Sequence, residues 1–210
     1  MYNFTIPMAL MDFVPVIFFG VSAVLLLRDL YTKMSKTAYA LLAAGSINVF
    51  LAGFCKALWK LLYAAGICDF QPLEQMFLPV NSMGLLMVGL SLIGMLCWKR
   101  KDAIMLSAAP AVVSGSLVFI MMMVVGLGGI CAVMSILAAR MKKKGTIILF
   151  VLSFVFAMGM GYMSSQDSTL AWVNWVEQSI NTVSQLCLMI GVIGLHKAGL
   201  AEYKFREAKA

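Results

Sequence analysis

The sequence contains little charge. Asp, Glu, Lys and Arg make up 12% of its 210 residues, whereas 62% are hydrophobic and the mean hydropathy is +0.96. A water-soluble domain of this length could not bury so much apolar surface, so a soluble globular fold is excluded. The sequence therefore predicts a membrane protein, with the lipid bilayer as its first partner.

The chain also lacks the motifs of common chemistry. It has a single histidine, His196, and no Ser-His pair, His-Glu-x-x-His segment or nucleotide-binding motif. Its five cysteines have neither the spacing of a disulfide framework nor that of a metal site. We therefore predict no catalytic residue, no metal and no cofactor, and a function that is not enzymatic.

The net charge of +7 comes from short basic clusters between apolar runs. Such clusters are typical of cytoplasmic loops rather than of a nucleic-acid-binding surface, so nucleic acid is not an expected partner. Residues 1–12 contain no Lys or Arg, which predicts an external N-terminus and an uncleaved first helix.

The longest uncharged segment, residues 103–139, lies between basic clusters at 99–102 and 140–144. Both clusters should stay in the cytoplasm, so the segment should cross the membrane and return. A turn at 114–116 leaves a short helix over 103–113, which is either a short span or a partial, re-entrant segment. A turn at 126–129 is the alternative.

The other apolar runs predict helices over residues 8–28, 37–65, 74–98, 117–140, 145–164 and 171–196. With the short helix they give an all-α, polytopic membrane protein of seven transmembrane helices, forming one domain over residues 1–210. The N-terminus is expected outside and the C-terminus in the cytoplasm, at the cell (plasma) membrane. Every Lys and Arg except Lys56 and Lys60 is then cytoplasmic, whereas six crossings would divide the basic residues between the two sides.

Short stretches recur in the two halves of the chain. Residues 73–75 correspond to 176–178, and residues 86–89 correspond to 188–191. They predict two repeats, 8–98 and 117–196, joined by a linking helix over 99–113. This plan of three, one and three helices resembles the SWEET and PQ-loop transporters in topology alone. Their Pro-Gln loop and helix prolines are not reproduced, so no functional residue is carried over.

A stripe of amide side chains follows the last helix at positions i, i+4, i+7 and i+11: Asn174, Gln178, Asn181 and Gln185. Facing lipid, the amides would lack hydrogen-bond partners, so the stripe should face inward. With Asn81, Lys56 and a stacking ring from Trp175 or Trp172, it is expected to line an externally open cavity for a small polar solute. The alternative is that the amides only join helices.

Four charged side chains are expected in the outer half of the membrane: Asp12, Lys56, Glu74 and Glu177. A cation as deep as Lys56 costs about 2.5–3.5 kcal/mol unless it is paired. We therefore expect an ion pair with Asp12, or with Glu74 as second choice. Lys60 lies nearer the helix end and should reach water. A role of Lys56 in substrate binding or proton coupling is the alternative.

These features favour a membrane transporter or facilitator of a small polar solute. A non-catalytic membrane subunit or sensor, acting through a membrane partner or as a homo-oligomer, would use the same polar groups as helix contacts. An intramembrane enzyme with Asp12, Glu74 and Glu177 as acid and base groups is the third class.

Overall fold

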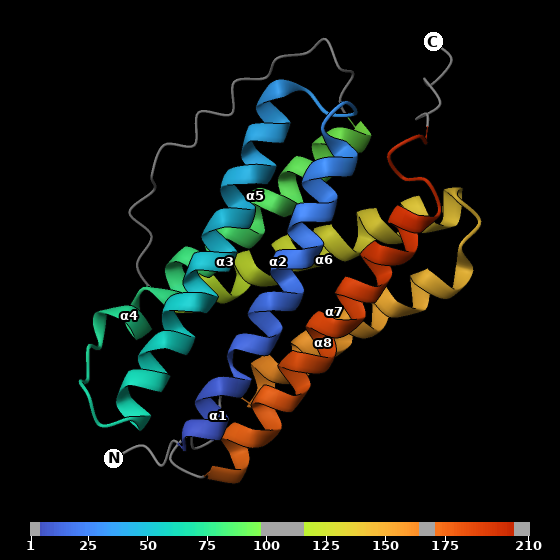
Figure 1. Cartoon of the computed structure of the whole chain (residues 1–210). Coiled ribbons are helices and arrows are strands. Elements are labelled where there is room, and N and C mark those ends of the chain that lie inside the picture. Colours follow the sequence, from blue (N-terminus) through green and yellow to red (C-terminus); the bar gives the residue numbers. More distant parts are fainter. Residues whose placement is uncertain (1–4, 98–115, 164–170, 204–210) are drawn as a thin grey trace.

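The computed structural model describes residues 5–97, 116–163 and 171–203, and their regular secondary structure is entirely α-helical (Figure 1). The long helices are α2 (Phe13–Leu30), α3 (Lys36–Ala64), α5 (Phe77–Cys97), α6 (Ser116–Arg140), α7 (Lys144–Met163) and α8 (Ala171–Lys197). Short helices α1 (Ile6–Met11) and α4 (Pro72–Gln75) precede α2 and α5. Six segments are long and apolar enough to cross a bilayer, which indicates a multi-pass membrane protein.

The outer surface of the helices is apolar, as lipid contact requires. Val24 is 66% exposed, Leu117 71% and Ile148 61%, on three different helices. In a soluble protein such a surface would drive association, whereas in a bilayer it matches the hydrocarbon chains.

The helices over residues 37–65, 117–140, 145–164 and 171–196 lie within about two residues of their predicted bounds, a margin typical of helix ends. The alternative turn at 126–129 is wrong, because those residues lie inside the continuous helix α6. The described residues contain six segments long and apolar enough to span a membrane, where seven were predicted for the chain. The predicted short helix over 103–113 lies outside the described residues.

The first predicted helix, over residues 8–28, is interrupted at Asp12, where α1 ends and α2 begins. Pro15 explains the interruption, because it has no backbone N–H to bond the carbonyl of Met11 and its ring crowds that carbonyl. The predicted helix over residues 74–98 is likewise interrupted, at Met76. The break at Asp12 matters for function, because the Asp12 side chain makes buried contacts inside the bundle.

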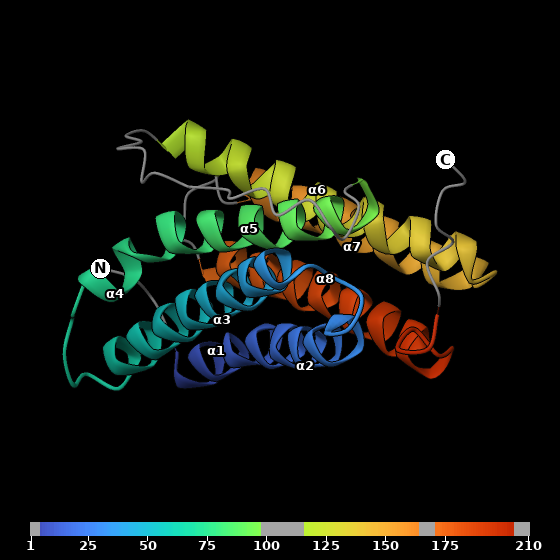
Figure 2. The same cartoon turned by 90° about the horizontal axis from the view of Figure 1, so that it is seen from above.

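The six long helices form a closed ring. Each packs on the long helix before it and on the one after it, and α8 packs on α2 to complete the circle. Figure 2 shows α2 and α6 on opposite sides of the bundle, as this order requires. The interior of the ring is therefore enclosed by all six helices.

Contacts between helices fix their directions. A Cβ at Gly126 would touch Leu85 and one at Gly129 would touch Ile93, so α5 and α6 run parallel. Helices α2 and α8 are also parallel, because Asp12 contacts Gln178 at one end and Asp29 contacts His196 at the other. Helices α3 and α7 run in the opposite direction to these four (Figure 1).

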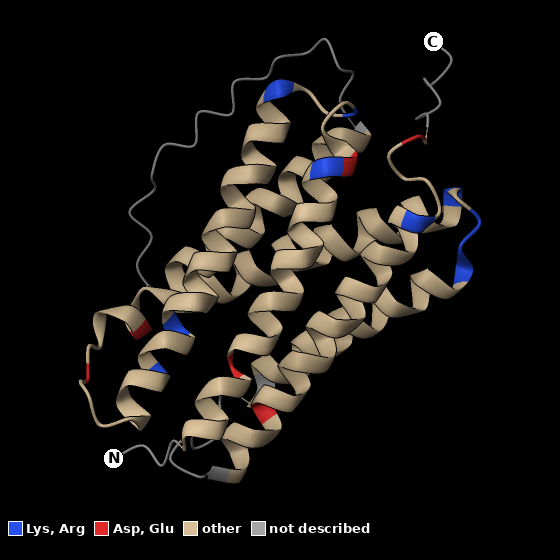
Figure 3. Ribbon diagram, in the orientation of Figure 1, with Lys and Arg blue, Asp and Glu red and all other residues tan. Residues whose placement is uncertain are grey.

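We call the end at which α2, α6 and α8 finish the basic end, and the opposite end the cavity end. Apart from Lys56 and Lys60, the described Lys and Arg residues gather at the basic end (Figure 3). They are Arg28, Lys33, Lys36, Arg140, Lys142, Lys143, Lys144 and Lys197. Lys33 donates a 2.7 Å hydrogen bond to the carbonyl of Tyr203, which fixes the chain after α8. Burial lowers the pKa of Lys33, and the nearby carboxylate of Asp29 opposes that shift.

Candidate functional site

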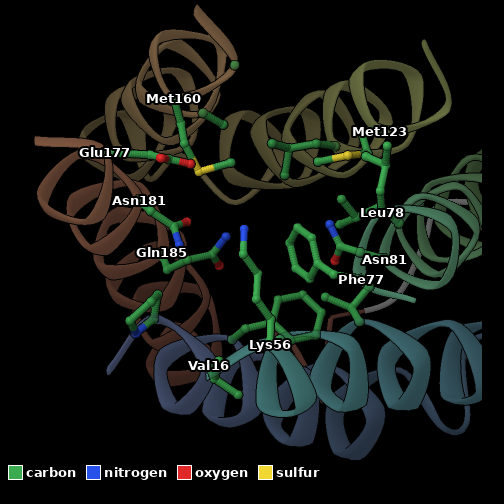
Figure 4. A pocket seen from close by; sticks show the side chains of 18 of the residues that line it. Val16, Lys56, Phe77, Leu78, Asn81, Met123, Met160, Glu177, Asn181 and Gln185 are labelled. Atoms are coloured by element: carbon green, nitrogen blue, oxygen red, sulfur yellow. The ribbon is translucent and has the colours of Figure 1, made fainter. Parts of the chain in front are cut away.

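A cavity of about 540 Å³ lies inside the ring, in the half of the bundle nearer the cavity end (Figure 4). All six long helices contribute to its lining. Its volume is within the range of about 300–1,000 Å³ that is usual for small-molecule pockets. The cavity is therefore large enough for a compact organic molecule.

The polar lining comes mainly from α8, which presents Glu177, Gln178, Asn181 and Gln185. Lys56 on α3 and Asn81 on α5 complete it from the other side (Figure 4), and Asp12 lies at its edge between α1 and α2. Successive members of the set Gln178, Asn181 and Gln185 are three or four residues apart, and Glu177 precedes Asn181 by four, so a straight helix brings these side chains to one wall. The structure thus gathers most of the polar residues singled out in the sequence.

Four residues expected at the site do not line the cavity. Asn174 is buried, with 5% of its surface exposed, and Glu74 lies on the short helix α4. Trp175 is 39% exposed and is absent from the lining, as is Trp172, so neither ring is available for stacking there. The aromatic surface of the cavity is supplied instead by Phe19, Phe50 and Phe77. These phenylalanines carried no sequence signal that separates them from core residues.

The carboxylate of Asp12 is paired with Lys60 and not with Lys56. The Lys60 ammonium lies 2.7 Å from Asp12 Oδ2, and 6% and 5% of the two residues are exposed. The Gln178 amide donates a hydrogen bond to Asp12 Oδ1 and thereby joins α8 to the break between α1 and α2. The expectation that Lys60 reaches water was therefore wrong. Because Lys56 and Lys60 are four residues apart on one helix face, sequence spacing could not decide between them.

Lys56 is half-buried and its ammonium points into the cavity (Figure 4). Its nitrogen lies 4.3 Å from the centre of the Phe77 ring, a cation–π contact. None of the carboxylates in the described residues lies within 4.0 Å of it. Lys56 is therefore the cation that the cavity presents to an occupant.

The amide stripe of α8 has two different roles. Gln178 is 8% exposed and binds Asp12, so it joins helices, whereas Asn181 and Gln185 point into the cavity beside Lys56 (Figure 4). Within the described part of the chain, the buried Oε1 atom of Gln185 has no hydrogen-bond partner. An unpartnered buried acceptor is costly, and two further oxygens of α8, Gln178 Oε1 and Thr182 Oγ1, are unpartnered in the same way.

The cavity is closed toward the basic end by a packed hydrophobic core. Leu42, Leu92 and Met134 come from three helices and have no exposed surface, and Val192 on α8 is equally buried. The bundle is therefore hollow in one half and solid in the other.

The described residues hold no group of three or more His, Cys, Asp or Glu side chains that could bind a metal ion. No protein-family model, no curated protein and no solved structure matches the chain. The cavity itself is thus the basis for a functional assignment.

Proposed function

We propose that this protein is a transporter or facilitator that moves a small polar solute across a membrane through the cavity of its helical ring. The proposal rests on one observation, the cavity. In it, an ammonium and two amides converge among apolar side chains inside a membrane-embedded bundle. Such groups are costly within a bilayer and are usually retained for binding or transport.

The proposal includes seven crossings of the membrane. Helix α5 ends at the basic end, whereas the parallel helix α6 begins at the cavity end. Residues 98–115 connect those two ends, and a helix of that length would cover about 27 Å of a hydrocarbon core of about 30 Å. The basic end is then cytoplasmic and the cavity end external, at the plasma membrane.

The same directions support two repeats in the chain. Helices α2, α3 and α5 run forward, back and forward, and so do α6, α7 and α8. Two such repeats would be related by an approximate twofold axis along the membrane normal. Alternating access would then require the packed core at the basic end to open while the external side closes.

A panel assay in proteoliposomes tests the proposed function. The purified full chain is reconstituted and its permeability measured by osmotic light scattering for glycerol, glucose, acetate, choline and L-leucine. We expect at least one solute to pass faster than in empty vesicles. That flux should fall in the variants Asn181→Ala and Gln185→Leu and persist in Ser179→Ala, which changes an exposed hydroxyl on the same helix.

Two results would contradict the transporter assignment. One is a folded protein that moves none of the solutes. The other is flux that both cavity variants leave unchanged, which would reduce the stripe to helix packing. Solute binding without flux would favour the second class, a sensor or a non-catalytic subunit.

A further inference from the structure

The cavity has two chemically different sides. Its charged and amide groups come from α3, α5, α8 and the break at Asp12. Helices α6 and α7 supply only apolar side chains and glycine, with Ile120, Met123, Val124, Met158 and Met160 prominent among them. Figure 4 shows Met123 and Met160 on the opposite side of the cavity from the helix that carries Lys56. A well-matched occupant therefore has a polar head and an apolar body.

The positive group for such an occupant is Lys56. Lys60 already neutralises Asp12, and the Phe77 ring covers one side of the Lys56 ammonium without supplying a full negative charge. The ammonium nitrogen points into the cavity, where the Asn181 and Gln185 amides lie on the wall formed by α8 (Figure 4). An ammonium flanked by amide N–H donors is a receptor for a carboxylate.

The negative group is Glu177. It lines the cavity on α8, one turn nearer the cavity end than Asn181, and its carboxylate lies next to Met160 (Figure 4). Within residues 5–97, 116–163 and 171–203, Lys and Arg make no ion pair with it. Among the described residues, the cavity thus presents a cation on α3 and an anion on α8, neither of which has an ion-pair partner within 4.0 Å.

We infer that the cavity binds a zwitterion with an apolar side chain, of the chemical class of the hydrophobic α-amino acids. The carboxylate of the ligand binds Lys56 and the two amides, its ammonium binds Glu177, and its side chain lies against α6, α7 and Phe77. A ligand with only a negative charge would leave Glu177 without a partner of opposite charge, and a ligand with only a positive charge would leave Lys56 without one. This inference rests on the proposed function and replaces its polar solute by an amphipathic one.

Binding of matched ligands tests the inference. The probes are L-phenylalanine, 3-phenylpropanoate, which lacks the ammonium, and phenethylamine, which lacks the carboxylate. Their affinities for the full chain in lipid nanodiscs are measured by isothermal titration at neutral pH. We expect L-phenylalanine to bind roughly ten- to a hundredfold more tightly than either analogue, because each analogue leaves a charged group of the site unpaired. L-leucine should bind as well.

Reciprocal variants assign the two ends of the ligand. Lys56→Gln should abolish the advantage of L-phenylalanine over phenethylamine, and Glu177→Gln should abolish its advantage over 3-phenylpropanoate. Ser179→Ala should leave all three affinities unchanged. If Lys56→Gln fails to fold, Lys56→Arg keeps the charge and should retain a preference for the carboxylate.

The outcomes separate the inference from the proposed function. Equal affinity for L-phenylalanine and 3-phenylpropanoate, or no binding of either amino acid, would overturn the inference. In that case, flux of glucose or acetate that depends on Asn181 would leave the transporter assignment standing. Conversely, binding of both amino acids with no flux in the vesicle assay would support the zwitterion site and reject transport.

Discussion

At the scale of single residues, two lysines that are alike in sequence have different environments. Lys60 is buried against Asp12, whereas Lys56 projects into the cavity over Phe77. The requirement for a buried partner was predictable from the cost of a cation in the membrane. Which lysine would take Asp12 was not, because the answer depends on the break before Pro15 and on the Gln178 amide from a distant part of the chain.

The Asp12–Lys60 pair is expected to stabilise the fold only as a unit. Replacing Lys60 by Met should lower the free energy of unfolding by about 3–5 kcal/mol, because it leaves a buried carboxylate without its cation. The double variant Asp12→Leu/Lys60→Met should be more stable than Lys60→Met alone. Unfolding of the full chain in mixed micelles, followed by circular dichroism, measures both. A Lys60→Met protein as stable as the parent would show that the pair is not formed.

At the scale of helices, close approach at glycine determines the packing of the ring. A Cβ at Gly126 would lie 2.5 Å from the carbonyl carbon of Leu85, and one at Gly45 would lie 2.7 Å from the carbonyl oxygen of Gly84. Backbones that come this close need residues without side chains, as is common in membrane helices. The sequence contains 17 glycines, and it does not show which of them face another helix.

Gly126→Ala is therefore expected to weaken the contact between α5 and α6. The clash is with backbone, which cannot move aside as a flexible side chain can, so the free energy of unfolding should fall by roughly 1–3 kcal/mol. Gly145→Ala is the matched control, since a Cβ there meets nothing within 4 Å and lies in the first turn of α7. The midpoint temperature of thermal unfolding should be clearly lower for Gly126→Ala than for Gly145→Ala. Equal stability would mean that α5 and α6 do not approach as described.

The sequence predicted the long helices well because apolar length and basic flanks are local signals. It also predicted that Asn181 and Gln185 face inward, since amides on a lipid-facing surface would lack partners. It did not predict the apolar wall of α6 and α7. The methionines there have the composition of ordinary core residues, and only the ring arrangement brings them to the cavity.

At the scale of the whole molecule, the account predicts that the two ends of the bundle lie on opposite sides of the membrane. Cys68 is exposed in the connection between α3 and α4, at the cavity end. In a variant in which the other cysteines are replaced, it should react with a membrane-impermeant maleimide added outside intact cells. Lys142→Cys, at the basic end, should react only after the cells are opened. Reaction of Lys142→Cys from outside would reverse or refute the proposed orientation.

The central claim is that the cavity inside the ring of helices is a water-filled binding site that opens at the cavity end. Labelling of Gln185→Cys in an otherwise cysteine-free chain tests it most directly, with a small charged methanethiosulfonate reagent added from outside. The account predicts rapid modification at this position and none at Val183→Cys, because Val183 is 39% exposed on the outer, lipid-facing surface of the same helix. A folded protein in which Gln185→Cys remains unmodified from outside would contradict the claim.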